Sequence, residues 1–141
     1  KCEALAKKSG GEIAMVEDPL KGTKDADVIY TDVWVSMGES EETWRSRIDA
    51  LHPYQVNDEM MDNASEKAIF MHCLPAFHGN DTDLGEEISK TFGDAYPNIA
   101  KGEMEVTDSV MESKQSVVFE EAENRLHTIK AVMLATMKDM D

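Results

Sequence analysis

The chain has 141 residues, 41% of them hydrophobic and 30% charged, which is enough for one ordinary domain with its own core. Its 29 acidic residues against 14 basic ones give a formal net charge of −15, which disfavours nucleic acid as a partner because such binding needs a basic surface. No apolar run approaches the roughly 18–20 residues of a membrane span, and no signal-peptide pattern is present, so we expect a cytoplasmic protein with no membrane partner.

Short apolar runs alternate with stretches of helical spacing along the chain. In chain order, the predicted elements are a helix over 2–8, a strand over 12–16, a helical turn from 19, a strand over 28–31, a helix over 40–51, a short helix over 57–64, a strand over 68–71, a helix over 84–92, a surface loop over 94–102, a helical turn after 107, a strand over 116–119 and a long helix over 120–140. This alternation predicts an α/β fold with a mainly parallel sheet. There is neither a glycine-rich phosphate loop nor a strand before the first helix, so we expect an incomplete domain.

Capping residues mark several of the predicted helix ends. Asp18, Ser40 and Asn57 suit helix N-termini, and Gly10 and Gly93 suit C-termini. The last helix has apolar residues at steps of three and four, and we expect this stripe and its methionines to serve packing: Ala122, Leu126, Ile129, Met133, Met137 and Met140.

Polar and turn-forming residues follow two of the predicted strands directly. Asp32 and the residues up to Gly38 come after one strand, and residues 72–77 come after another. In open α/β sheets, ligands bind in the crevice outside the carboxyl ends of the strands. The two strand ends therefore predict two walls of one pocket.

Cys73 is the sharpest candidate for chemistry, as a nucleophile, as a polar contact to a substrate, or merely as a core residue. Free cysteine is among the most buried residue types, so the residue type alone favours the core. A thiolate would need a nearby positive charge or a helix N-terminus, and His72 should face away from its neighbour in a strand. With Cys2 as the other cysteine, the spacing fits neither a disulfide framework nor a zinc site, and we expect no metal.

A second group of candidates lies after the strand over 28–31. The carboxylate of Asp32, the hydroxyl of Ser36 and the loop amides near Met37 are groups that can hold the ammonium and carboxylate of an amino acid. The same residues also fit ordinary capping of the next helix, and their spacing leaves both interpretations open.

Arg125 also has two interpretations, an ion pair with Glu121 one turn earlier or a grip on a phosphate or carboxylate. We expect His78 and His127 to be surface or packing residues.

Four separated strings resemble ornithine carbamoyltransferases: DVWVSMGE (residues 32–39), FMHCLPAFH (70–78), MEVTD (104–108) and AENRLHTIKAVM (122–133). The resemblance runs over nearly the whole chain and corresponds to the carboxyl-terminal, ornithine-binding part of that family. It implies a Rossmann-like sheet flanked by helices. It also implies that residues 1–141 are a fragment without the amino-terminal carbamoyl phosphate domain and without the first part of the ornithine-binding domain.

The family makes citrulline and phosphate from ornithine and carbamoyl phosphate, so the resemblance implies these two substrates and no cofactor. By resemblance, Asp32, Ser36 and Met37 would hold the amino-acid end of ornithine. The Ser36-Met37-Gly38 loop is similar to one that closes over ornithine, which would exclude water from a labile acyl phosphate.

By the same resemblance, Cys73 and Leu74 would line the reacting centre, and Arg125 would contact carbamoyl phosphate. A carboxylate and a thiol beside ornithine's side-chain amine can orient it and help to deprotonate it. The family reaction is a direct transfer, so Cys73 is interpreted as a positioning and polarising group and not as a nucleophile.

Three rival interpretations stand beside this one. An aspartate-specific relative would have His-Pro-Leu-Pro at residues 72–75, and a putrescine-specific one would lack the Ser-Met-Gly sequence at 36–38. A non-catalytic binding or interaction module with the same fold belongs to a different class. The resemblance further implies a homotrimer or larger assembly for the parent enzyme, and we expect the fragment alone to be inactive.

Overall fold

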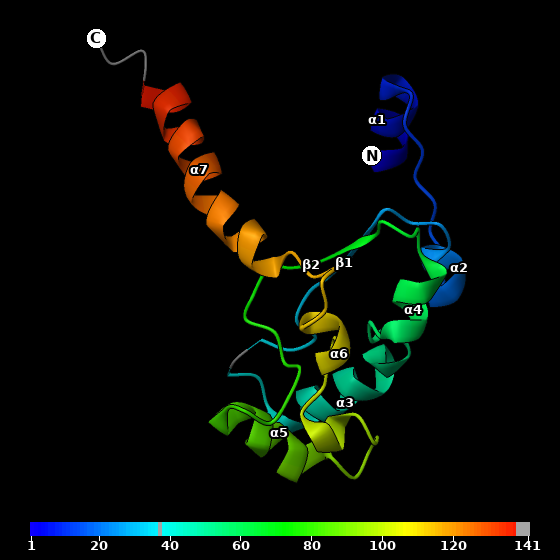
Figure 1. Ribbon diagram of the computed structural model, residues 1–141, viewed down its shortest axis with the longest axis vertical. Coiled ribbons are helices and arrows are strands. Elements are labelled where there is room, and N and C mark those ends of the chain that lie inside the picture. The colour runs from blue at the N-terminus through cyan, green and yellow to red at the C-terminus, as the bar shows by residue number, and fades with distance from the viewer. Residues whose placement is uncertain (37, 138–141) are drawn as a thin grey trace.

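The computed structural model describes residues 1–36 and 38–137, and a two-stranded parallel sheet lies at its centre (Figure 1). The elements in chain order are α1 (Cys2–Ser9), α2 (Pro19–Thr23), β1 (Val28–Thr31), α3 (Glu41–Leu51), the 3-10 turn η1 (His52–Tyr54), α4 (Asp58–Asn63), β2 (Ile69–His72), α5 (Asp83–Phe92), the 3-10 turn η2 (Ile99–Lys101), α6 (Asp108–Met111) and α7 (Val118–Met137). The order of helices and strands confirms the predicted α/β class.

The register of the sheet brings both strands to the same edge. β1 pairs in parallel with β2, from Val28 opposite Ile69 to Thr31 opposite His72. The residues that follow Thr31 and His72 therefore leave the sheet side by side, as the two strand ends predicted. An isolated parallel bridge between Phe70 and Ser116 extends the pairing on the far side of β2.

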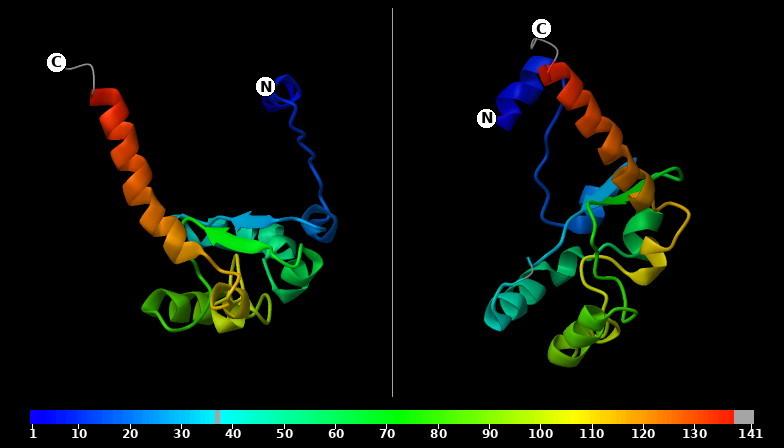
Figure 2. Two further views of the ribbon diagram at one scale, coloured as in Figure 1. Left: turned by 45° about the horizontal axis from the view of Figure 1, so that its top comes forward. Right: turned by 90° about the vertical axis from the view of Figure 1, so that its left-hand side faces the viewer.

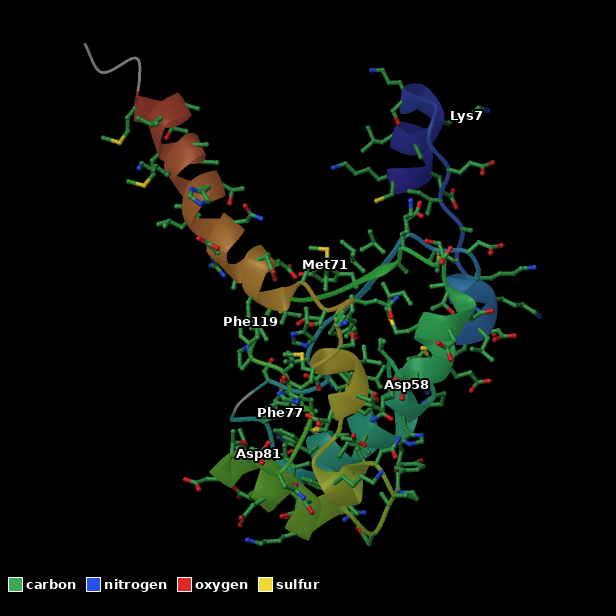
Figure 3. All side chains as sticks on the ribbon, viewed as in Figure 1. Lys7, Asp58, Met71, Phe77, Asp81 and Phe119 are labelled. Carbon is green, nitrogen blue, oxygen red and sulfur yellow. The ribbon has the colours of Figure 1, made fainter. Side chains whose placement is uncertain are left out.

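The helices divide between the two faces of this sheet. α3, α4, α5 and α6 lie on one side, whereas α1 and α7 project from the other side (Figure 2). The alternation of side chains along the strands agrees with this division, because Ile29 and Phe70 face the covered side and are buried, while Val28 and Tyr30 face the other side and are about half exposed. Met71, labelled in Figure 3, is one of the partly buried residues of β2, which alternate with the buried Phe70 and His72.

Two apolar clusters fill the covered side. The first joins β1 and β2 to α4, α6 and the start of α7: Ile29, Val56, Met60, Met61, Ala68, Phe70, Val106, Val110, Met111 and Val118. The second joins α3 and α5 to the segment after β1: Trp34, Val35, Trp44, Ile48, Phe77, Ile88, Phe92, Ile99 and Met104. The burial of Trp34 and Val35 anchors the chain between Asp32 and Ser36, so the second cluster supports one wall of the predicted pocket.

Three of the predicted N-caps are confirmed. The side chains of Asp18, Ser40 and Asn57 each accept a backbone N–H from the first turn of their helix. Gly10 ends α1 in the left-handed conformation at φ 80°, which glycine adopts without steric cost. Thr107 does precede α6, but its side chain makes no capping hydrogen bond, and its hydroxyl pairs with that of Ser109.

Three local predictions are wrong. Residues 12–16 form no strand, and exposed side chains such as Met15 show that their apolar pattern has no surface to pack on within the described chain. The strand over 116–119 is reduced to the bridge at Ser116, because α7 already begins at Val118. The 94–102 segment is not only surface loop, since it contains η2 and the fully buried Ile99.

The apolar stripe of α7 is present but does not pack as predicted. Leu126, Ile129, Met133 and Met137 are 48–67% exposed, so within the described chain nothing covers this face. Met140 lies outside the described residues. No helix among the described residues is both long enough and apolar enough to cross a membrane.

Candidate functional site

The strand ends bring Asp32 and Cys73 into direct contact. The thiol of Cys73 donates a hydrogen bond to Oδ1 of Asp32 at 3.0 Å. The same oxygen accepts the backbone N–H of Val33 at 2.7 Å, which fixes the carboxylate against its own turn. Both residues are exposed, so this carboxylate–thiol pair is open to a ligand, and the core interpretation of Cys73 is wrong.

The contact sets the charges of the pair. The thiol hydrogen bond, followed by the Val33 amide, lowers the pKa of Asp32 below its ordinary value. The bond to Asp32, followed by partial burial and the carboxylate charge, raises the pKa of Cys73. At neutral pH the pair is therefore an ionised carboxylate beside a neutral thiol. A neutral thiol is a weak nucleophile, so the geometry favours a positioning role for Cys73 over a covalent one.

This arrangement predicts the alkylation behaviour of Cys73. In the whole protein, replacing Asp32 by asparagine exchanges the thiol's hydrogen bond to a carboxylate for a weaker one to a neutral amide and removes the negative charge, so the pKa of Cys73 should fall and iodoacetamide should label it about 3–10 times faster at pH 8. The measurement is peptide mass spectrometry over time, with the exposed Cys2 as an internal reference whose rate should not change. An unchanged or slower rate at Cys73 in the variant would contradict the assigned charges.

The segment after Asp32 is held from behind and leaves Ser36 exposed. Arg47 donates to the carbonyl of Trp34 at 3.0 Å, and the carbonyl of Ser36 accepts the Glu39 N–H at 3.3 Å. Ser40 caps α3, so the capping interpretation of Asp32 and Ser36 is wrong. Met37, the third residue predicted for this wall, lies outside the described residues.

Leu74 continues the turn in an unusual conformation. Its φ is 46°, in the left-handed region that leucine rarely adopts, and its N–H donates to Nδ1 of His72 at 2.9 Å. The Leu74 side chain packs against the first apolar cluster. This turn places the backbone of Leu74 next to the carboxylate–thiol pair.

Arg125 lies one helical turn beyond Glu121 on α7, yet the two do not form the ion pair that sequence spacing allowed. Oε2 of Glu121 instead accepts the backbone N–H of His72 at 3.1 Å. Interaction with Glu121, mainly by hydrogen bonding, also raises the pKa of Tyr30 above its ordinary value. Glu121 thus ties the start of α7 to the end of β2. Arg125 is exposed and forms no ion pair with any residue the structure describes.

Sequence reasoning missed the long-range contacts at this edge. Glu121 and His72 are 49 residues apart, and no local pattern in the sequence links them. His78 also has a partner, since its Nδ1 lies 2.9 Å from Oδ1 of Asp108.

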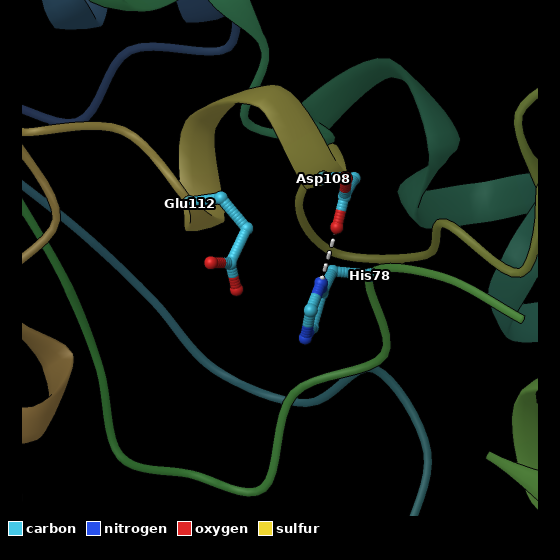
Figure 4. Close-up of side chains that lie close together, drawn as sticks. All are labelled: His78, Asp108 and Glu112. Atoms are coloured by element: carbon cyan, nitrogen blue, oxygen red, sulfur yellow. Dashed lines mark hydrogen bonds and ion pairs between the residues drawn. The ribbon is translucent and has the colours of Figure 1, made fainter. Parts of the chain in front are cut away.

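Three potential metal ligands meet where the turn runs toward α6. His78, Asp108 and Glu112 each offer an atom within 4.8 Å of the other two, although the sequence predicted no metal (Figure 4). The hydrogen bond between His78 and Asp108 by itself explains why these two side chains lie close together. Its observed effect is to fasten the end of the turn to the first residue of α6.

A cavity of about 400 Å³ lies beside this edge and not at it. Its walls come from the start of α3, from α5 and from the loop before α3: Gly38, Glu39, Glu41, Trp44, Leu84, Glu87, Ile88, Thr91 and Phe92. Asp32, Ser36 and Cys73 do not line it. The carboxylate–thiol pair is thus an open corner, which needs further walls to enclose a ligand.

Comparison with known proteins identifies relatives along almost the whole chain. The sequence model of the family described as "Aspartate/ornithine carbamoyltransferase, Asp/Orn binding domain" matches residues 1–136. A protein of Pediococcus pentosaceus named ornithine carbamoyltransferase is 56% identical over 140 residues, which are 99% of this chain and 40% of that protein. A protein of Staphylococcus aureus with the same name is 54% identical over 138 residues, which are 97% of this chain and 39% of that protein.

Solved structures agree with the sequence relatives. The ornithine carbamoyltransferase from Pyrococcus furiosus superimposes with a TM-score of 0.71 at 42% identity, over 94% of this chain and 34% of that chain. The chain therefore spans about 40% of the length of the curated relatives it matches and about a third of the solved one.

Proposed function

Because the chain belongs to the family of aspartate/ornithine carbamoyltransferase Asp/Orn-binding domains, we propose that the protein containing it carbamoylates L-ornithine. The reaction would take the carbamoyl group from carbamoyl phosphate to the side-chain amine and give L-citrulline and phosphate. The observation that carries the proposal is the 3.0 Å contact between the Asp32 carboxylate and the Cys73 thiol at the shared strand edge. The names of the relatives from Pediococcus and Staphylococcus support the same substrate.

The charge of this corner favours ornithine over aspartate as the acceptor. An ionised Asp32 attracts the ammonium groups of ornithine and repels the carboxylates of aspartate. The net charge of −15 acts in the same direction on a cationic amino acid that approaches the protein. Ser36 and Met37 would hold the amino-acid end of ornithine from the adjoining loop.

The chemistry needs positioning more than a covalent intermediate. The neutral amine of ornithine attacks the carbonyl carbon of carbamoyl phosphate, so a C–N bond forms while the bond from that carbon to the phosphate oxygen breaks. The phosphate leaves with the electron pair and takes up the proton that the amine loses. Asp32 and Cys73 orient the amine, Leu74 lines the reacting centre, and Arg125 balances the charge of the phosphoryl group.

We further propose that residues 1–141 supply the ornithine half of the site, within a fragment of the ornithine-binding domain. The open corner and the share of about 40% of the relatives' length support this division. The remaining ligands of carbamoyl phosphate would come from the rest of the protein. We therefore expect no citrulline from residues 1–141 alone, measured colorimetrically in a preparation free of the whole protein.

The test of the proposed function is a comparison of acceptors with the whole protein. With carbamoyl phosphate at saturation, ornithine should be carbamoylated at least roughly 100 times more efficiently than putrescine or aspartate, because putrescine leaves the carboxylate-binding groups unpaired. A preference for either competitor would refute the assignment of ornithine. Ornithine binding in a calorimeter without any carbamoyl transfer would instead support the non-catalytic module.

A further inference from the structure

A fully buried pair of ionisable side chains lies beneath the turn that carries Cys73. His72 and Glu105 are both 0% exposed, and Nε2 of the histidine lies 3.2 Å from Oε1 of the glutamate. The contact lacks the alignment of a regular hydrogen bond, and Oε2 of Glu105 has no partner among the described residues. Buried ionisable groups with incomplete pairing are costly, so this arrangement calls for a reason other than packing.

Each member of the pair holds one end of the turn. Nδ1 of His72 accepts the N–H of Leu74 at 2.9 Å. Oε1 of Glu105 accepts the N–H of Phe77 at 2.9 Å. The two side chains therefore bracket residues 73–76, the stretch that presents the thiol to Asp32.

The hydrogen bonds also fix the state of the histidine. Because Nδ1 accepts the Leu74 N–H, the neutral ring carries its proton on Nε2, which faces Glu105. The bond from Leu74 holds that residue at φ 46°, a conformation it would not keep without a constraint. A buried network of this kind allows one arrangement of the turn and penalises the others.

We propose that His72 and Glu105 are positioning residues, which set the path of residues 73–76 and so keep the Cys73 thiol against Asp32. The proposal deepens the proposed function, on which its kinetic consequences rest. Both side chains are fully buried, so neither is exposed to a ligand. Both act through the turn and through the 3.0 Å contact that the turn permits.

The test compares two substitutions of Glu105 in the whole protein. Glu105→Gln keeps a carbonyl oxygen for the Phe77 N–H and should retain kcat within about threefold. Glu105→Ala removes both contacts and should lower kcat for ornithine by roughly 10–100-fold, the loss expected when reacting groups are misplaced by about an ångström. If the turn moves away from Asp32, the thiol pKa falls toward its ordinary value, and Cys73 should also be alkylated faster at pH 8 in the alanine variant.

Asn57→Ala is the control for lost stability alone, because the Asn57 side chain caps α4 by accepting the Met60 N–H and makes no hydrogen bond with the turn. It should lower the melting temperature while leaving kcat and the alkylation rate of Cys73 unchanged. If Glu105→Ala does not fold, His72→Asn and His72→Leu replace it, since asparagine can still accept the Leu74 N–H and leucine cannot. The asparagine variant should then keep the slow alkylation that the leucine variant loses.

The alkylation readout needs neither substrate, so it separates this inference from the proposed function. A wild-type protein without transferase activity would refute the function, and the alkylation comparison would still decide the role of the pair. The positioning role would be overturned if folded Glu105→Ala were alkylated at Cys73 at the wild-type rate. It would also be overturned if Glu105→Ala and Glu105→Gln lost kcat equally.

Discussion

Asp32→Asn in the whole protein is expected to lower kcat/KM for ornithine by about 10²-fold, the loss expected when a reacting group is no longer held in position. Asparagine has the shape of aspartate and keeps an oxygen that can accept from Val33 and Cys73, so the fold should survive. What disappears is the negative charge that draws in the amine of ornithine and holds it for attack. Steady-state kinetics with carbamoyl phosphate at saturation measures the effect.

The pH dependence of this loss has a defined form. Because the pKa of Asp32 lies below its ordinary value, the carboxylate is already ionised throughout the neutral range. The ratio of wild-type to variant kcat/KM should therefore stay constant between about pH 6 and pH 9. A ratio that collapses toward one at pH 6 would show that Asp32 takes up a proton in that range, against the assigned charge.

Asp27 provides a matched control on the same strand. It precedes β1 at the amino end, whereas Asp32 follows it at the carboxyl end, and its Oδ1 accepts from the Ser65 hydroxyl at 3.2 Å. Asp27→Asn should leave kcat/KM within about twofold, since it changes the total charge equally but far from the reacting groups. Equal losses in both variants would mean that general charge, and not the carboxylate–thiol pair, governs activity.

The elements that the sequence predicted well are those whose causes are local. Ser40 and Asn57 cap their helices because a short polar side chain reaches a backbone N–H only three residues away. β1 has the predicted bounds because a β-branched and aromatic run is enclosed by polar residues. The meeting of Asp32 and Cys73 followed from a rule of topology, since neighbouring parallel strands end at one edge.

The failures share a physical cause, which is that a local pattern does not reveal what will cover it. Residues 12–16 have strand-like composition, but a strand needs a partner for its backbone groups, and the described chain offers none there. The stripe of α7 has the period of a packed helix face and stays exposed for the same reason. The contacts of Glu121 and Glu105 link residues 49 and 28 positions apart, a distance that no periodicity encodes.

Arg125→Gln is expected to raise KM for carbamoyl phosphate roughly 10–100-fold while leaving thermal stability unchanged. A charge-assisted hydrogen bond to an ionised group contributes about 1.5–3 kcal/mol, which corresponds to that range of affinity. Stability should not change, because the Arg125 side chain is exposed and forms no ion pair with any described residue. Paired measurements of KM and melting temperature in the whole protein test both parts.

The role proposed for Arg125 rests on its position on α7. Glu121 fastens the first turn of α7 to His72 through a contact at 3.1 Å, and Arg125 follows one turn later on the same helix. Arg125→Lys should restore only part of the affinity, because an ammonium cannot reproduce the two-pronged grip of a guanidinium on a phosphate. Lys130→Gln removes an equal charge from the same helix and should leave KM within about twofold. If Lys130→Gln weakened carbamoyl phosphate binding as much as Arg125→Gln, the effect would come from the general charge of the helix and not from a direct contact. Arg125 would then lose its assigned role.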